Sequence, residues 1–170
     1  MRSKAGVVAA LLLSCAVNPD AAQPVARTRL VLRVEPEARL DPPQVSLSFR
    51  VSADGLSDVT SQTASVAAWV RALPRQRIRV TARLASLNGP DGPAPVSAVR
   101  WAGSTARAAA GGQAATCSSA AFRPDTTQDL VLGWQRSGIL VCAVTFELAA
   151  PRSLSPGPYS GTVDLALDIR

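Results

Sequence analysis

Apolar side chains occupy every second position along much of the chain, which is the pattern of β-strands with one buried face. The alternating runs comprise residues 30–34, 45–51, 78–84, 99–101, 130–134, 140–148 and 159–169. Turn-forming residues separate them, and the clearest turn is Asn88-Gly-Pro-Asp-Gly-Pro93. Residues 64–72 fit a strand and a helical stripe equally well, and we interpret them as a strand because the segment is short. The spacing predicts eight or nine strands and no long helix.

This pattern predicts an all-β fold, namely an antiparallel immunoglobulin-like β-sandwich of about seven to nine strands. Residues 28–170 are expected to form that single domain. Trp101 and Trp134 alternate in phase with apolar neighbours and are predicted to lie in the core, whereas Trp69 is out of phase and is predicted to be exposed. Residues 105–116 are rich in alanine and glycine, so we expect a mobile loop there.

The first 16 residues are typical of a signal peptide. Arg2 and Lys4 precede the apolar run AGVVAALLL, which as a helix spans only about half of a membrane's hydrocarbon core. A signal peptidase could cut after Ala16. Alternatively, Leu-Leu-Ser-Cys15 resembles a bacterial lipobox, in which Cys15 is acylated. Residues 17–27 would then be a tether, and we expect export to the periplasm or cell surface, or lipid anchoring at the outer membrane through Cys15.

The remaining cysteines form an even pair. Cys15 is removed or acylated under either interpretation, which leaves Cys117 and Cys142. Such a pair forms a disulfide in an oxidising compartment, and a loop of about 25 residues would contribute roughly 3.5 kcal/mol in the chain-entropy model. The alternative is two buried free thiols.

The composition argues against familiar catalytic and metal sites. The chain has no histidine, and its only lysine, Lys4, lies in the signal peptide, so neither residue can serve as the base for a serine or cysteine nucleophile. There is no G-x-S-x-G, P-loop, G-x-G-x-x-G or C-x-x-C motif. Asp164 and Asp168 would share one face of a strand about 13 Å apart, which is too far for a glycosidase pair. We therefore expect no catalytic residue, no metal and no cofactor.

Arginine supplies the most basic surface feature. Four arginines should project from one face of a strand and the turn before it: Arg75, Arg77, Arg79 and Arg83. They could bind an anionic surface polymer such as polysaccharide or lipid headgroups. Nucleic acid is not expected, because no aromatic residue interleaves with the arginines and the protein is exported. The other interpretation is a solvated or edge-protecting face paired with Asp164 and Asp168.

Residues 137–170 read SGILVCAVTFELAAPRSLSPGPYSGTVDLALDIR. A cysteine-bearing strand, a proline-glycine turn and a final alternating strand that begins Tyr-Ser-Gly-Thr-Val resemble bacterial pilin-like subunits, and the segment is similar to secreted domains of the spore-coat-U type. The resemblance implies an immunoglobulin-like sandwich, export, a disulfide and assembly by strand exchange, with no catalytic residue. Such pilin subunits carry their cysteines nearer the N-terminus and have a longer donor segment. Here the donated residues would be Leu30, Leu32 and Val34.

Two functions follow from these observations. The first is a non-enzymatic exported surface or periplasmic protein, a structural or adhesive pilin-like subunit. It would pair with other copies or related subunits through edge strands, using residues 30–34 or the terminal strand 159–169. The alternative is a monomeric periplasmic or lipid-anchored module that binds an anionic ligand through the arginine face.

Overall fold

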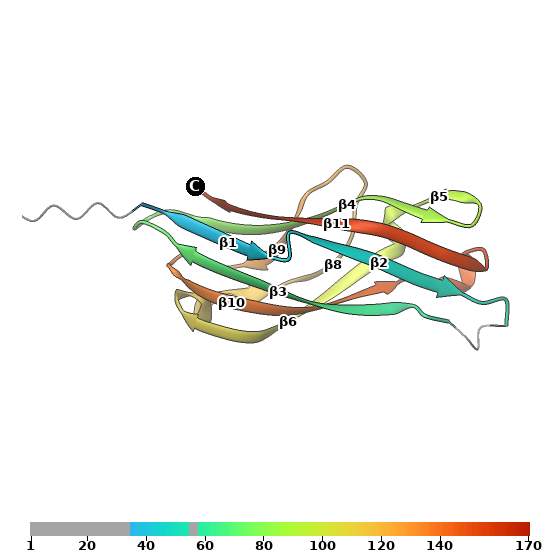
Figure 1. Cartoon of the computed structure of the whole chain (residues 1–170), viewed down its shortest axis with the longest axis horizontal. Coiled ribbons are helices and arrows are strands. Elements are labelled where there is room, and N and C mark those ends of the chain that lie inside the picture. The colour runs from blue at the N-terminus through green and yellow to red at the C-terminus, as the bar shows by residue number, and fades with distance from the viewer. Residues whose placement is uncertain (1–34, 55–57) are drawn as a thin grey trace, which may run out of the picture. The chain divides into compact units, whose positions relative to one another are not determined.

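The computed structural model describes residues 35–54 and 58–170, and within them the fold is an all-β sandwich of two antiparallel sheets (Figure 1). The β10 sheet has the order β1 (Glu37–Asp41), β3 (Ser61–Arg71), β10 (Gly138–Leu148), β6 (Val99–Ala110) and β8 (Ser119–Ala121). The β11 sheet has the order β2 (Gln44–Val51), β11 (Gly157–Ile169), β4 (Ile78–Gly89), β9 (Gln128–Leu132) and β7 (Thr116–Cys117), with β5 (Gly92–Ala94) beside β4. The short 3-10 turns are η1 (Val96–Ala98), η2 (Gly111–Ala114) and η3 (Pro151–Ser153).

The long alternating runs form the predicted strands and supply the core between the sheets. Every second residue of β2 and of β10 is buried, as the period of two requires. The predicted strand over residues 64–72 is confirmed by β3. The ring of Phe122 lies with its centroid 4.6 Å from that of Trp101 and 6.3 Å from that of Phe146, at the centre of the packing. Burying each of these rings stabilises the fold by about 1.5–3 kcal/mol.

The chain changes sheets between its first two described strands. β1 pairs with β3 in the β10 sheet, whereas β2 pairs with β11 in the opposite sheet. Pro42 and Pro43 lie between them and have no backbone N–H to continue a ladder, so the strand breaks and crosses over at this point.

The expected mobile loop at residues 105–116 was wrong. β6 continues to Ala110, paired with β10 along its whole length, and η2 follows directly. The small residues are there because backbones approach closely. A Cβ on Gly112 would lie 2.2 Å from the carbonyl oxygen of Ile139, so a larger residue would force the turn away from β10.

The alternation predicted for residues 130–134 also fails. Leu130 and Val131 are both buried, while Leu132 is half exposed at the end of β9. The pairing of β9 with β4 shifts register opposite Val80 and Thr81, which breaks the period of two. Gly133 then turns the chain with a φ of 76° before Trp134 enters the core.

The predicted signal peptide, the tether, Cys15 and the run containing Leu30, Leu32 and Val34 lie outside the described residues. None of the helices in the described part of the chain is long and apolar enough to cross a membrane.

Candidate functional site

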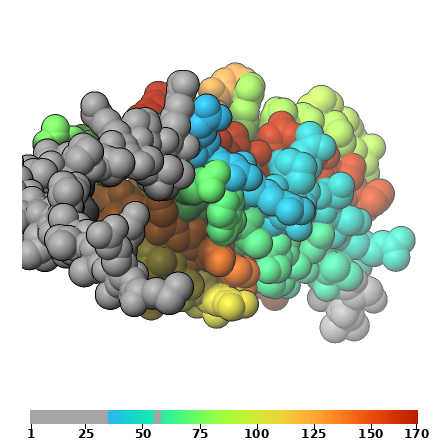
Figure 2. Space-filling model, turned by 60° about the vertical axis from the view of Figure 1, so that its left-hand side comes forward, coloured from blue at the N-terminus to red at the C-terminus, as the bar shows by residue number. Residues whose placement is uncertain are grey.

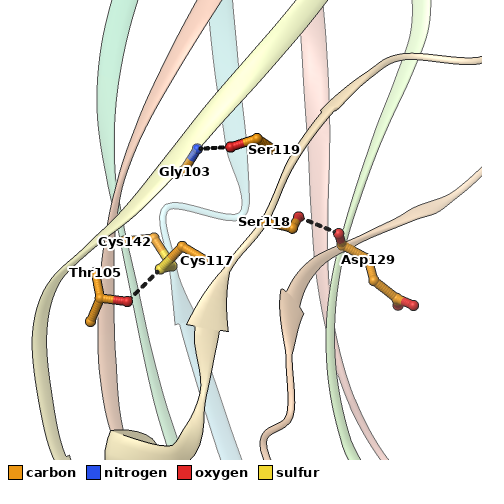
Figure 3. Close-up of a disulfide and its surroundings, with 7 residues drawn as sticks. All are labelled: Gly103, Thr105, Cys117, Ser118, Ser119, Asp129 and Cys142. Carbon is orange, nitrogen blue, oxygen red and sulfur yellow. Dashed lines mark hydrogen bonds between the residues drawn. A yellow bond between two sulfur atoms is a disulfide. The ribbon is translucent and has the colours of Figure 1, made fainter.

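The predicted disulfide is present between Cys117 and Cys142, whose Cα atoms are 5.9 Å apart. It connects β7 at the end of the β11 sheet to the centre of the β10 sheet, so it links the two sheets (Figure 3). Neighbouring bonds hold the same segment: the Ser118 hydroxyl donates to the Asp129 carbonyl at 2.6 Å, and the Gly103 amide donates to the Ser119 hydroxyl at 3.2 Å. The bridge is therefore part of the framework.

The four arginines predicted to share a face divide into two pairs. Arg79 and Arg83 project from the exposed face of β4, where carboxylates surround them. Arg79 forms an ion pair with Asp129 at 2.7 Å, and Arg83 lies 3.8 Å from Asp125. This part of the predicted arginine face is charge-balanced, which makes it a poor site for an anion.

The aspartates expected as partners lie opposite these arginines but bond elsewhere. Asp164 and Asp168 occupy the paired positions of β11 across from Arg83 and Arg79. Asp164 accepts a hydrogen bond from the Gln44 side chain at 2.8 Å, and Asp168 is bonded to Arg170. Asp164 and Asp168 nevertheless place negative charge beside Arg83 and Arg79, which makes this face less attractive to an anion.

Arg75 and Arg77 lie instead in a pocket at one end of the sandwich. We call this end the proximal end, because the described chain begins there at residue 35; it contains the 72–77 turn, the 133–137 turn and Arg170. The pocket has a volume of about 670 Å³ and lies between the two turns. Its lining comprises Ala72, Leu73, Pro74, Arg75, Gln76, Arg77, Gly111, Gln135, Arg136 and Ser137. Three of these residues are basic and none is acidic.

Hydrogen bonds from Ser137 join the walls of the pocket. Its hydroxyl accepts from the Ala72 amide at 2.9 Å and donates to the Ala72 carbonyl at 3.0 Å, which ties the two turns together. Its carbonyl accepts from the Gly111 amide at 2.9 Å. Gly111 must be small, since a Cβ there would lie 2.5 Å from the Cβ of Arg136. The pocket is thus set by contacts between three separate segments.

The backbone positions of the three arginines are also fixed. Arg75 has a positive φ of 74°, in a turn closed by the Gln76 side chain, which accepts from the Leu73 amide at 2.6 Å. The Arg77 backbone exchanges two hydrogen bonds with Arg170, at 2.6 and 2.9 Å. The Arg136 carbonyl accepts from the indole of buried Trp134 at 2.8 Å. The backbone at each of the three arginines is therefore held in place by hydrogen bonds of its own turn or strand.

The lining of the pocket carries a net positive charge. Among the described residues, no carboxylate forms an ion pair with Arg75, Arg77 or Arg136. A guanidinium group carries its charge throughout the physiological pH range and binds phosphate, sulfate or carboxylate oxygens in a bidentate way. Arg136 was missed by the sequence analysis because only the fold brings it beside Arg75 and Arg77.

Strand edges offer a second type of candidate site. β11 lies between β2 and β4 over residues 160–164, so the prediction that the terminal strand is an edge was wrong for that part, whereas residues 166–169 pair with β4 alone. The outer edge of β2 is occupied, because the Gln62 side chain accepts from the Ser48 amide at 3.0 Å and donates to the Ser46 carbonyl at 2.8 Å. The outer edge of β6 pairs with β8 only at residues 100–102, and no described strand pairs with residues 104–110 there. Cys117 of β7 lies against the first part of this stretch, with its sulfur 3.5 Å from the Thr105 hydroxyl.

The described residues contain no group of three or more His, Cys, Asp or Glu side chains placed to hold a metal ion. The pKa of Asp58 is lowered from its ordinary value. The main cause is the hydrogen bond from the Ser52 amide, at 2.6 Å, followed by that from the Ser52 hydroxyl, at 2.7 Å. These bonds brace a loop far along the chain from the pocket.

Comparisons with known protein families, with curated proteins and with solved structures find no match to this chain.

Proposed function

We propose that this protein is a non-enzymatic, exported binding module that takes an anionic ligand in the proximal pocket. The observation that carries the proposal is the convergence of Arg75, Arg77 and Arg136 from two turns, with no acidic residue in the lining. The three exposed cations carry no ion pair within the described residues, so a bound anion would gain from all three charges. The Cys117–Cys142 disulfide supports export, since such bonds persist mainly in oxidising compartments.

The pocket suits a ligand with several anionic oxygens. Its volume of about 670 Å³ lies in the usual range for small-molecule sites. Three arginines from two turns line it, and a guanidinium group can present a parallel pair of N–H donors, which matches phosphate, sulfate or clustered carboxylates. Ala72, Leu73 and Pro74 add an apolar wall. This assignment moves the anion site from the strand face expected from sequence to the end of the sandwich.

Calorimetric titration of the full chain with inorganic pyrophosphate tests the proposal. We expect binding that weakens at least tenfold in the variant Arg75→Gln/Arg77→Gln/Arg136→Gln. Binding should also weaken as salt rises from about 0.01 to 0.1 M, where the Debye length falls from roughly 30 to 10 Å. The matched control is Arg50→Gln/Arg123→Gln/Arg152→Gln, which removes the same charge from exposed arginines without ion pairs. Equal affinity in both variants would contradict the proposal.

A structural or adhesive pilin-like subunit is the second candidate, and the unpaired outer edge of β6 at residues 106–110 favours it. Such an edge can accept an added strand from another copy or a related subunit. The residues proposed as donors, Leu30, Leu32 and Val34, lie outside the described part. An unboiled extract on a denaturing gel should then show a ladder that collapses on boiling and disappears when residues 28–35 are deleted. A single monomer band in both lanes would exclude strand exchange.

A further inference from the structure

We infer that the anionic partner is the surface of a membrane rich in anionic phospholipid, on which the domain lies with its proximal end. This inference rests on the proposed function, because it uses the same three arginines. It adds a partner class and a contact surface: lipid phosphates would occupy the pocket, while exposed apolar side chains around it enter the headgroup region.

The preceding chain reaches the domain beside the pocket. The Arg71 side chain donates to the Glu35 carbonyl at 3.3 Å and pairs with Glu37 at 2.9 Å, so the start of the described chain is held against the end of β3. β3 runs directly into the pocket turn. Figure 1 shows the start of β1, the end of β3 and the C-terminus at this same end. Any anchor on the chain before residue 35 would therefore be attached at the proximal end of the domain, so this end would lie nearest the membrane.

The sequence leading to this end has the same sign of charge. Residues 21–34 contain Arg27, Arg29 and Arg33 and no acidic residue. Within the domain, Glu37 is paired with Arg71 and Asp168 with Arg170, so neither of these acids offsets the pocket arginines. Basic residues close to an anionic leaflet attract it within a Debye length. The sequence before the described chain is therefore basic up to Val34, and the acidic residues Glu35 and Glu37 follow it.

Exposed apolar residues also lie at the proximal end, and they favour a membrane surface over a soluble anion as the partner. The large hydrophobic residues exposed in the described part are Val59 at 52%, Trp69 at 37%, Leu73 at 40% and Leu132 at 51%. All but Val59 are at the proximal end: Trp69 precedes the end of β3, Leu73 lines the pocket, and Leu132 ends β9. A free phosphate does not solvate these side chains, whereas a membrane interface accommodates tryptophan and leucine beside basic groups.

Trp69 also belongs to a mixed row across the β10 sheet. The register aligns Arg39, Trp69, Ile139 and Ala109 on successive strands. Figure 2 turns this end forward and shows β1, β3 and β10 as adjoining blue, green and orange-brown bands. The row places an arginine next to the exposed indole at the edge of the sheet. A basic and apolar surface thus continues from the pocket onto one face of the sandwich.

Sedimentation with vesicles tests the inference. The full chain is mixed with vesicles of phosphatidylcholine and phosphatidylglycerol, and separately with vesicles of phosphatidylcholine alone. Since the apolar N-terminal segment is the same in every sample, the difference between the two vesicle types isolates the charge effect. Three arginines at an anionic surface should together change partitioning about 100-fold. We expect that preference to fall by about this factor in Arg75→Gln/Arg77→Gln/Arg136→Gln, which keeps the basic residues at 27, 29 and 33, and to be unchanged in the Arg50/Arg123/Arg152 control.

A second readout locates the contact. Brominated lipids quench tryptophans that enter the interface, and Trp101 and Trp134 are buried. Quenching should therefore come from Trp69 and disappear in Trp69→Phe. If the pocket arginines bind pyrophosphate but the chain shows no preference for anionic vesicles, the membrane inference is overturned and the proposed function stands. If neither probe is bound through these arginines, both are overturned.

Discussion

Removing the disulfide should cost a large part of the protein's stability. The perturbation is the double substitution Cys117→Ala/Cys142→Ala, which avoids leaving a polar atom at buried Cys142. The cross-link spans 25 residues of sequence. For a loop of that length the chain-entropy relation gives about 12 cal/mol/K, or roughly 3.5 kcal/mol at 25 °C. Folded domains are stable by only about 5–15 kcal/mol, so the loss would be a large fraction of the total.

Loss of the disulfide should destabilise the short strands β7 and β8 most. β7 is paired only through Thr116 and Cys117, opposite Leu132 and Val131 of β9. β8 is held by three pairs to β6. Two short ladders of this kind are weak alone, and the cross-link to β10 is what fixes their ends. Amide exchange should therefore speed up first around residues 115–121, while β10 and β11 stay protected.

Urea unfolding of three samples provides the assay: oxidised wild type, reduced wild type and the double-alanine variant. With a slope of about 2 kcal/mol/M, the midpoint should fall by nearly 2 M in both altered samples. Reduced wild type lacks the cross-link but keeps the sulfur atoms. Comparing it with the double-alanine variant therefore distinguishes the stability lost with the cross-link from the stability lost with side-chain volume. A loss below about 1 kcal/mol in both samples would refute the reasoning, because even a short loop closure predicts more.

Three further substitutions test the pocket frame, a close backbone contact and a pH response. Ser137→Ala removes two hydrogen bonds between the turns, so it should cost about 1–2 kcal/mol in urea unfolding and weaken pyrophosphate binding without changing charge. Gly112→Ala should cost about 1–3 kcal/mol, because its Cβ would meet the Ile139 carbonyl; unchanged stability would contradict that contact. Hydrogen bonds from Ser52 lower the pKa of Asp58, so that carboxylate stabilises the fold above its ordinary pKa of 3.8 and ceases to do so as pH falls through the lowered value. Wild type should be more stable than Asp58→Asn at neutral pH, and the thermal-melting difference should shrink in acid.

The strands that lie across the core were predictable because one side of each faces apolar neighbours. β2, β4, β10 and β11 all have alternating sequences, and all four are strands of the sandwich. β1 was not predicted, since its sequence EARLD has no buried position and is held by backbone pairing to β3. The alternation of apolar and polar residues arises because one face of a strand is buried. A strand with no buried face, such as β1, therefore lacks this pattern.

The pocket could not be predicted for a different reason. Arg75 and Arg77 stand out in the sequence as a cluster, but their place beyond the strand face depends on the turn before β4. Arg136 comes beside them because the turn before β10 meets the turn after β3, which is a property of strand order. Local patterns gave the charges and the strands, while the convergence of the charges depends on contacts between distant segments.

The position of β11 has a consequence for how the chain folds. The last strand in the sequence is an inner strand of its sheet, and its neighbour β2 is the second strand described; the side-chain bond between Gln44 and Asp164 joins residues 120 apart. Until residues 157–169 have left the ribosome, β2 and β4 lack the strand that lies between them, so the β11 sheet closes only after most of this domain has been made. Non-local pairing of this kind is slow to form. The central pair of strands in the β11 sheet should therefore be among the last contacts to form, well after the turns that connect neighbouring strands.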